Sequence, residues 1–375
     1  MRVMIAGGGT GGHISPGIAI ADALERASEG VEVFFMGRRD SIEERLVGRT
    51  GRDFVAVPSM GLRRRADVRN LVMPFTVAGG YLRALAVLGS RRPDVAVGTG
   101  GFVSLPPMLA ARTLSIPIVL QEQNSYPGLA TRVLSRVARS VHTSFEETEK
   151  HLPGARDVVL SGNPVRAEFS EADRGSSRLS LGIPEDARVV LLVGGSRGAR
   201  RINDAVSAAA RTLADADVTL IVQTGRYDSA AVGAALDAAG VRAMVEPFFD
   251  DMATVYAAAD LVVSRSGATA IAEMEVVGKP SILVPYPYAT EGHQMKNARA
   301  VESAGAATVI PDEELTGDRL AGEVIGLLSD VERLALMARR ARTLARPDAA
   351  ERVAGAVLAL AGERRRPRGD GRTEQ

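Results

Sequence analysis

The 375-residue sequence lacks cysteine and tryptophan, and neither sign of charge prevails in it. Without cysteine there can be no disulfide framework, no thiolate zinc site and no cysteine nucleophile, which suits a reducing compartment. Basic and acidic side chains number 46 and 45, so the formal charge is +1 and no overall field attracts nucleic acid. We therefore expect neither a disulfide-stabilised protein nor a nucleic-acid partner.

Long apolar runs are missing as well. The run at residues 1–6 is too short for the core of an export signal, and the stretch at residues 71–88 is broken by Pro74, a glycine pair and Arg83. A clean membrane span needs about 20 apolar residues. Hydrophobic residues still make up 46% of the chain, so a sizeable core can form. We expect a protein that is made and kept in the cytoplasm.

Short apolar runs alternate with longer helical segments along the chain. Nine runs predict strands, at residues 3–6, 31–36, 54–57, 95–98, 118–121, 189–193, 218–223, 261–264 and 281–284. These runs do not alternate between apolar and polar residues, which is typical of parallel strands that are covered by helices on both faces. The pattern predicts an α/β fold with doubly wound sheets.

The two halves of the chain begin in the same way. Residues 2–6 lead into the glycine-rich loop 7–12, and residues 188–193 lead into a second glycine-rich loop at 194–199. Each half can therefore open with a strand, a glycine turn and a helix, and the break between them falls near Pro164. We predict two Rossmann-like domains that face a central cleft, with ligands at the carboxyl ends of the strands.

The first glycine loop predicts a diphosphate site. Five glycines and Thr10 precede a helix, whose N-terminal N–H groups suit anionic oxygen. The spacing also fits a dinucleotide fingerprint, but the second strand ends at Arg38 instead of an acidic residue, which disfavours NAD and leaves NADP open. His13 follows the loop directly. It is a candidate general base, with a structural role as the equal alternative.

Two later loops are further candidates for phosphate. Ser196 lies in the second glycine loop, where its hydroxyl could bond a phosphate oxygen. Residues 266–273 follow a strand and open a helix, on which Thr269 and Glu273 share one face. Glu273 is placed to accept two ribose hydroxyls, unless it is a solvated helical acid like Glu275.

One acidic pair matches the pattern by which many glycosyltransferases hold a metal. Asp215 and Asp217 sit at a helix end before a strand, away from the loops described above. A solvated turn is the more common origin of such a pair, so we predict no dedicated metal site.

Together these motifs resemble the MurG family, membrane-associated transferases that add N-acetylglucosamine to lipid I and so make lipid II for peptidoglycan. The motifs follow the family order along nearly the whole chain, at residues 7–13, 98–102, 121–124, 162–166, 194–196, 248–252, 265–273 and 293–294. The resemblance implies UDP-N-acetylglucosamine as donor, lipid I as acceptor and no cofactor.

The resemblance also implies a GT-B fold, whose last helix returns to the first domain. The acceptor and membrane-binding domain would comprise residues 1–164 plus a helix at about 347–362. The donor-binding domain would comprise residues 165–346, and residues 363–375 would form a disordered tail.

Roles for individual residues follow from the same resemblance. Glu273 would hold the ribose, and the backbone around Phe249 would meet the uracil. The remaining substrate-binding residues would be Arg166, Ser196, Ala268 and Thr269 around the diphosphate loops, Asn124 and Gln294 at the sugar, and Thr10, Gly11 and Gly12 between donor and acceptor. The chain departs from some relatives, which carry glutamine at the position of His293.

An inverting transfer of this class needs a base for the acceptor hydroxyl and positive potential for the departing diphosphate. His13 is the first candidate for the base and Glu122 the second. In the absence of a metal, helix N-termini and an arginine would supply the positive potential.

The charge of the chain is unevenly distributed. Residues 1–164 hold 20 basic and 15 acidic side chains, a surplus of five, and the segment 61–92 alone holds seven arginines against Asp67. Apolar residues fringed by arginine predict an interfacial patch on anionic lipid, formed by Arg63, Arg64, Arg65, Arg69, Leu71, Val72 and Phe75. The alternative is an ordinary helix with its apolar side in the core, which we expect for residues 81–88. The patch predicts a peripheral protein at the cytoplasmic face of the cell membrane.

Three other readings share some of these features. Another GT-B transferase or a UDP-sugar epimerase would have the nucleotide site without the lipid patch. An NADP oxidoreductase would use the first glycine loop and Arg38, and would leave the later loops unexplained. A non-catalytic nucleotide-binding membrane protein would keep Glu273 and the patch.

Overall fold

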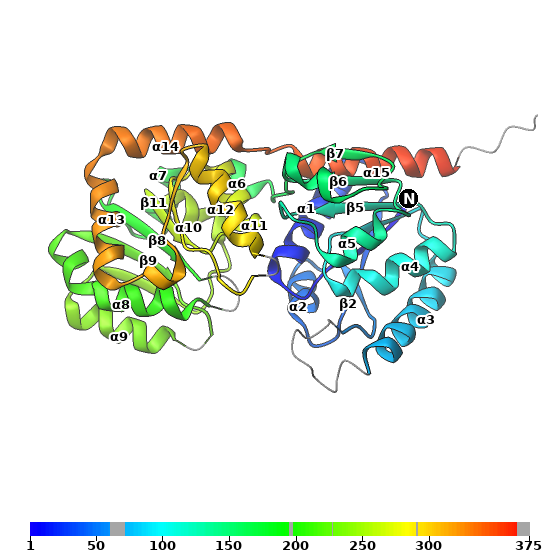
Figure 1. Ribbon diagram of the computed structural model, residues 1–375, viewed down its shortest axis with the longest axis horizontal. Coiled ribbons are helices and arrows are strands. Elements are labelled where there is room, and N and C mark those ends of the chain that lie inside the picture. Colours follow the sequence, from blue (N-terminus) through cyan, green and yellow to red (C-terminus); the bar gives the residue numbers. More distant parts are fainter. Residues whose placement is uncertain (61–71, 195–197, 227, 290–291, 366–375) are drawn as a thin grey trace, which may run out of the picture. The chain divides into compact units, whose positions relative to one another are not determined.

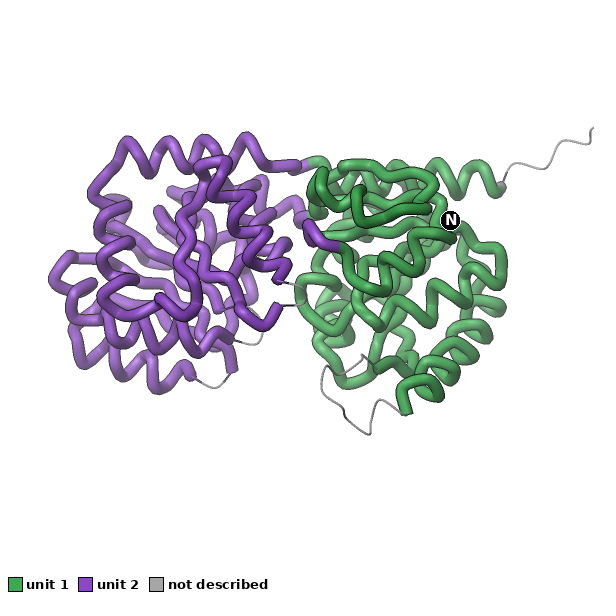
Figure 2. The backbone as a smooth tube through the Cα atoms, viewed as in Figure 1, with its two compact units in different colours: residues 1–123, 127–164, 348–375 green, residues 124–126, 165–347 purple. Residues whose placement is uncertain are grey.

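The computed structural model describes residues 1–60, 72–194, 198–226, 228–289 and 292–365. The chain forms two compact units, which are coloured separately in Figure 2. Unit 1 comprises residues 1–123, 127–164 and 348–375, and unit 2 comprises residues 124–126 and 165–347. The short segment 124–126 therefore packs with unit 2, although the residues on both sides of it belong to unit 1. A domain boundary at residue 164 alone does not account for this segment.

Unit 1 is built on a parallel sheet of seven strands in the order β3-β2-β1-β4-β5-β6-β7. Figure 1 labels β2, β5, β6 and β7 of this sheet. The strands are β1 (Arg2–Ala6), β2 (Glu32–Gly37), β3 (Asp53–Ala56), β4 (Val95–Gly98), β5 (Ile118–Glu122), β6 (Ser140–Thr143) and β7 (Val158–Leu160). The helices are α1 (Gly11–Ala27), α2 (Ile42–Arg49), α3 (Met73–Arg91), α4 (Leu105–Thr113), α5 (Leu129–Leu134) and α15 (Ala349–Arg365), with 3-10 turns η2 (Phe102–Ser104) and η3 (Glu146–His151).

Unit 2 repeats this plan with a parallel sheet of six strands in the order β10-β9-β8-β11-β12-β13. The strands are β8 (Arg188–Val193), β9 (Val218–Gln223), β10 (Ala243–Glu246), β11 (Leu261–Ser264), β12 (Ser281–Leu283) and β13 (Ala307–Val309). The other elements are α6 (Glu168–Glu171), α7 (Arg174–Ser180), α8 (Arg200–Asp215), α9 (Ser229–Ala239), α10 (Met252–Ala258), α11 (Ala268–Val277), α12 (His293–Ser303), η5 (Asp312–Glu314), α13 (Gly317–Ser329) and α14 (Val331–Leu344).

Both sheets have the doubly wound strand order. The first strand of each unit is central, and later strands are added first on one side of it and then on the other. In unit 1, β1 pairs with β2 on one side and β4 on the other, and Val3, Met4 and Ile5 are fully buried. Apolar side chains fill one core beneath α1 and α15 and another beneath α3 and α4. The prediction of two Rossmann-like α/β sheets is confirmed.

The sequence did not predict four strands, β6, β7, β10 and β13. Each has only three or four residues, and all but β6 are partly exposed, so they lack a long apolar run.

The prediction that the disordered tail begins at residue 363 is wrong. Helix α15 continues to residue 365, and the Arg364 guanidinium donates to the carbonyls of Pro93 and Asp94 at 3.0 and 3.1 Å.

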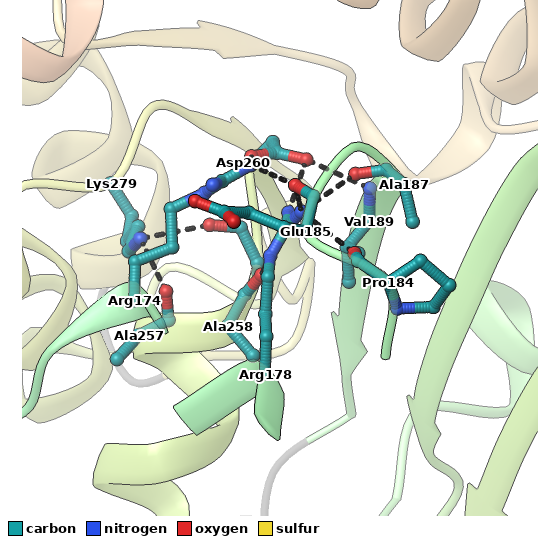
Figure 3. A network of polar contacts seen from close by, with 11 residues as sticks. Arg174, Arg178, Pro184, Glu185, Ala187, Val189, Ala257, Ala258, Asp260 and Lys279 are labelled. Atoms are coloured by element: carbon teal, nitrogen blue, oxygen red, sulfur yellow. Dashed lines mark hydrogen bonds and ion pairs between the residues drawn. The ribbon is translucent and has the colours of Figure 1, made fainter. Parts of the chain in front are cut away.

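A buried polar network closes the amino-terminal edge of the sheet in unit 2 (Figure 3). The side chain of Arg178 is 1% exposed and donates to the carboxylate of Asp260 at 2.7 Å. It also donates to four carbonyl groups, those of Pro184, Glu185, Ala187 and Ala258. Asp260 accepts the N–H of Val189 at the start of β8, at 2.9 Å. One guanidinium thus ties α7, β8 and the start of β11 together.

Lys279 belongs to the same edge. Its ammonium group donates to the carbonyls of Ala257 and Ala259 at 2.9 and 2.8 Å. Burial lowers the pKa of this amine to about 8, and the charge of Asp260 opposes the shift. Arg178, Asp260 and Lys279 are therefore buried polar groups of this edge that all have partners.

Candidate active site

The first glycine loop connects β1 to α1 in unit 1. Thr10 is the N-cap residue of α1 with extended backbone angles, and its side chain makes no capping hydrogen bond. The first turn of α1 also contains no acidic residue. Gly11 and Gly12 begin the helix, so no acidic residue of the first turn offsets the positive end of the α1 dipole. This is the geometry expected of an anion site.

A carboxylate that the sequence did not point to occupies part of this loop. Glu43 is 0% exposed and accepts the N–H of Gly9 at 3.2 Å and the N–H of Arg38 at 3.3 Å. A Cβ atom at Gly8 would lie only 2.6 Å from the Glu43 carboxyl carbon, which explains glycine at that position. Since this carboxylate is buried against the loop backbone, it is not placed to hold a ribose as the dinucleotide fingerprint requires.

His13 lies in the first turn of α1 and is half-buried. Its Nδ1 atom is 2.7 Å from the Oε1 atom of Gln123, which follows β5. The ring packs on the loop that follows β4, where Cβ atoms at Gly100 and Gly101 would come within 3.0 and 3.3 Å of the imidazole. Both glycines have positive φ angles, 94° and 77°. Glycine is thus required at both positions for two reasons, the positive φ angles and the close approach of the imidazole ring.

Glu122, the second candidate base, is 2% exposed at the end of β5. Its Oε2 atom accepts the N–H of Gly128 at 3.1 Å. The carboxylate therefore anchors the chain that returns from the segment 124–126 toward α5. Its role as a base stays a prediction.

The segment 124–126 is held in unit 2 by α12. Ser125 donates its hydroxyl to the Oδ1 atom of Asn297 at 2.9 Å, and the Asn297 amide donates to the carbonyl of Ser266 at 3.3 Å. Lys296 lies 4.7 Å from the ring centroid of Tyr126. Asn297 is 0% exposed, and no sequence pattern singled it out. Asn124 is therefore positioned among residues of the unit that carries Glu273.

Helix α11 supplies the predicted ribose and phosphate residues. It begins at Ala268 after the N-cap residue Gly267, and its first turn, which contains Thr269, has no acidic residue. Glu273 follows one turn later. Burial raises the pKa of its carboxyl to about 7, the positive charge of Arg166 opposes the shift, and the charge of Glu168 adds to it. A hydrogen bond from Tyr256 also opposes the shift, so burial is the cause that prevails, as is common for carboxyl groups in functional sites.

Two neighbours of Glu273 complete this region. Arg166 pairs with Glu168 at 2.7 Å. Tyr256 on α10 is 0% exposed, and its hydroxyl interacts with the Glu273 carboxylate. Burial first, and then the negative charge of Glu273 and a hydrogen bond to its side chain, raise the pKa of Tyr256 well above its usual range. The phenol is thus a buried polar neighbour of Glu273.

The remaining predicted donor residues are held by short loops. Gln294 accepts the N–H of Tyr286 at 2.9 Å with its side chain, and its carbonyl accepts the Ser266 hydroxyl at 2.8 Å. The N–H of Phe249 donates to the side chain of Gln223 at 3.0 Å. Ser196 lies outside the described residues. The predicted site residues are thus divided between the two units. Unit 1 contains Thr10, Gly11, Gly12, His13 and Glu122, and unit 2 contains Asn124, Arg166, Phe249, Ala268, Thr269, Glu273 and Gln294.

Both carboxylates of the acidic pair before β9 have cationic partners. Asp217 pairs with Arg242 at 2.6 Å and Asp215 with Arg211 at 3.2 Å. Elsewhere in the described chain, no three acidic or histidine side chains gather closely enough to hold a metal ion.

The predicted membrane patch is only partly within the described residues, because Arg63, Arg64, Arg65, Arg69 and Leu71 lie outside them. Val72 and Phe75, at the start of α3, are 55% and 76% exposed. Leu82 is 63% exposed, so the prediction that residues 81–88 bury their apolar side is wrong for Leu82, while Ala84, Val87 and Leu88 are buried. The spacing of Val72, Phe75 and Leu82 places them on one helix face. None of the described helices is long and apolar enough to cross a bilayer.

Comparisons with known proteins identify the family. Residues 3–143 match the Glycosyltransferase family 28 N-terminal domain, and residues 189–353 match the Glycosyltransferase family 28 C-terminal domain. A protein of Salinibacter ruber is 43% identical over 363 residues, 96% of this chain and 97% of that protein. A protein of Chlorobium luteolum is 43% identical over 367 residues, 97% of this chain and all of that protein. Both are named UDP-N-acetylglucosamine--N-acetylmuramyl-(pentapeptide) pyrophosphoryl-undecaprenol N-acetylglucosamine transferase.

Solved structures agree. The crystal structure of Acinetobacter baumannii MurG has a TM-score of 0.74 at 28% identity and covers 96% of this chain and 99% of its own. The calicheamicin glycosyltransferase CalG4 has a TM-score of 0.67 at 16% identity, covers 98% of this chain and 99% of its own, and so shares the fold. The chain belongs to glycosyltransferase family 28 and, within it, to the MurG transferases.

Proposed function

We propose that this chain transfers N-acetylglucosamine from UDP-N-acetylglucosamine to the C4 hydroxyl of the muramyl sugar in lipid I, which yields lipid II. The observation that carries the proposal is Glu273. This half-buried carboxyl follows by one turn a helix N-terminus that has no side-chain cap, and burial raises its pKa to about 7 although Arg166 and Tyr256 act in the opposite direction. A diphosphate at the start of α11 and two ribose hydroxyls at Glu273 would satisfy these groups together.

The reaction is a single displacement with inversion. The acceptor oxygen forms a bond to C1 of the sugar, the bond from C1 to the UDP oxygen breaks, and the electron pair leaves with the diphosphate. The positive end of the α11 dipole and the Arg166 guanidinium favour the charge that develops on the leaving group. His13 takes the proton of the acceptor hydroxyl as general base.

The donor site is tested by thermal shift with UDP-N-acetylglucosamine, UDP and NADP. We expect the two uridine nucleotides to stabilise the wild type and NADP to have no effect. Glu273→Gln should lose the stabilisation. Glu275→Gln is the matched control, because Glu275 lies on the same helix and burial likewise raises its pKa, to about 8. Stabilisation by NADP, or equal loss in both variants, would contradict the donor site.

The base is tested by kinetics with a lipid I analogue. We expect His13→Ala to lower kcat by about 100-fold or more, because general base catalysis contributes roughly that much, while the affinity for UDP-N-acetylglucosamine changes little. Unchanged turnover in this variant would sink the assignment of His13.

We also propose that the protein meets the cytoplasmic face of the cell membrane as a peripheral protein through the α3 patch, defined here as Val72, Phe75 and Leu82. Exposed apolar side chains on one helix face, next to an arginine-rich segment, favour the interface of an anionic bilayer.

The double variant Phe75→Ser with Leu82→Ser tests the patch, because it should weaken sedimentation with vesicles that contain phosphatidylglycerol. Leu179→Ser is the control, because Leu179 is 84% exposed in unit 2. Arg63, Arg64 and Arg65 changed together to Glu should abolish binding, and vesicle binding equal to wild type in both patch variants would remove the patch.

A further inference from the structure

We propose that Gln123 is a positioning residue that fixes the tautomer of His13. In this account the His13 imidazole carries its hydrogen on Nδ1, and Nε2 keeps the lone pair that accepts a proton. The catalytic role of Gln123 rests on the proposed function, in which His13 is the general base. The tautomer itself follows from contacts within unit 1 alone.

The orientation of the Gln123 amide is set by its surroundings. Its Nε2 atom lies 2.8 Å from the carbonyl oxygen of Thr99 and also contacts the side-chain oxygen of Gln121. A backbone carbonyl can only accept a hydrogen bond, so the group that faces Thr99 must be the NH₂ group. Gln123 is 2% exposed, which leaves no water to compete for these positions.

The Oε1 atom of Gln123 is therefore the atom that faces His13. It lies 2.7 Å from Nδ1, within hydrogen-bond distance. An amide oxygen is only an acceptor, so Nδ1 must be the donor and carry a hydrogen. In the neutral imidazole the other nitrogen, Nε2, is then unprotonated. The hydrogen-bond chain from Thr99 through Gln123 to His13 thus leaves one tautomer.

The ring is also held in place by packing. The imidazole rests on the backbone of Gly100 and Gly101, where any side chain would come within 3.0 to 3.3 Å of it. This loop is itself tied to the first glycine loop, because the N–H of Gly8 donates to the carbonyl of Gly100 at 3.3 Å. Ring orientation and tautomer are consequently fixed before any ligand arrives.

An amide in this place differs from a carboxylate. A carboxylate would select the same tautomer, but it would also stabilise the protonated imidazolium and raise the pKa of the histidine. In serine proteases, replacement of the triad aspartate by asparagine leaves the wrong tautomer. Here the carbonyl of Thr99 holds the NH₂ group away from His13, so an amide performs the orienting task without adding a negative charge.

The tautomer is measured by long-range proton–nitrogen correlation spectra of protein labelled at histidine nitrogen. The chain has only four histidines, and His13→Ala assigns the signal of interest. At about pH 8, where a free imidazole is neutral, we expect a protonated Nδ1 and an unprotonated Nε2 for His13. We expect Gln123→Ala to give a mixture of tautomers. A protonated Nε2 in the wild type, or an unchanged spectrum in Gln123→Ala, would overturn the proposal.

Kinetics separate this role from a merely structural one. Gln123→Ala should lower kcat by about 10- to 100-fold with little change in the KM for UDP-N-acetylglucosamine. Gln123→Glu keeps the length of the side chain and should move the acidic limb of the kcat/KM profile to higher pH, because a carboxylate favours the imidazolium. Ser135→Ala is the control, since Ser135 is also buried in unit 1 and its hydroxyl bonds only the local carbonyl of Arg132 among the described residues.

The proposed function and the role of Gln123 can be contradicted separately. If the wild type lacks transferase activity but shows the Nδ1–H tautomer, the proposed function fails and the role of Gln123 in the tautomer stands. If Gln123→Glu leaves the pH profile in place and Gln123→Ala keeps full turnover, the role of Gln123 is contradicted even in an active enzyme.

Discussion

The two edges of the sheet in unit 2 treat buried polar groups in opposite ways. At the amino-terminal edge, the guanidinium of Arg178 meets Asp260 and four carbonyl groups, and Lys279 meets two more. At the carboxyl-terminal edge, burial raises the pKa of Glu273 to about 7, although the charge of Arg166 and the hydroxyl of Tyr256 oppose the shift. The amino-terminal edge thus holds the fold together, and we propose that the carboxyl-terminal edge takes up the ligand.

The largest effect is expected from breaking the amino-terminal edge. Arg178→Ala removes every donor of the guanidinium and leaves Asp260 and several carbonyls without it, so we expect a loss of about 3–5 kcal/mol in the free energy of unfolding. Urea denaturation measures this loss. The affinity of the molecules that remain folded for UDP should not change. A loss below about 1 kcal/mol would mean that the network does not hold the edge together.

At the other edge, a variant should gain stability. Above pH 7 the wild type carries an ionised Glu273 in a partly dry site, so Glu273→Gln should raise the free energy of unfolding at pH 8 by about 1–3 kcal/mol. The same variant should lose its stabilisation by UDP. Denaturation at pH 8 with and without UDP measures both. A less stable variant would show that the Glu273 carboxylate is already well satisfied.

The two edges should also respond to pH with opposite signs. The pKa of Glu273 is about 7 in the folded state, above the value of 4.5 in a free side chain, so its contribution to stability is lost as pH rises from 4.5 through 7. The pKa of Lys279 is about 8, below 10.5, so its contribution is recovered as pH rises from 8 to 10.5. The differences between wild type and the Glu273→Gln and Lys279→Met variants, followed across pH, isolate each slope. Equal slopes for wild type and variant would contradict the assignment.

The smallest effect concerns the hydroxyl of Tyr256. Tyr256→Phe removes a buried hydroxyl together with its interaction with Glu273, and these two effects oppose each other, so we expect the free energy of unfolding to change by less than about 1 kcal/mol. Thermal denaturation without ligand measures the change. A larger destabilisation would show that the hydroxyl makes a strong hydrogen bond to Glu273.

Much of the fold could be predicted because it depends on local patterns. Strands such as β4, β9 and β11 are predominantly apolar runs, and the structure gives them the predicted bounds. The strands β10 and β13 lie at the two edges of the unit 2 sheet and are short and partly exposed, so a run of apolar residues did not mark them.

The site was predictable only where one local motif carries it. A glycine loop before a helix leads to Thr10 and His13, and a helix start after a strand leads to Glu273. The roles of Glu43 and Gln123 were not predicted. Each is a buried polar residue whose role depends on contacts with residues 24 to 110 positions away in the chain. Such residues look like ordinary polar positions until the strands are placed side by side.

The most direct test of the account is a single transfer assay that follows disaccharide and UDP together, with UDP-N-acetylglucosamine and a lipid I analogue. We expect β-linked disaccharide and UDP in equal amounts from the wild type and from Glu275→Gln, and neither from Glu273→Gln. Release of UDP without disaccharide, or full activity in Glu273→Gln, would contradict it.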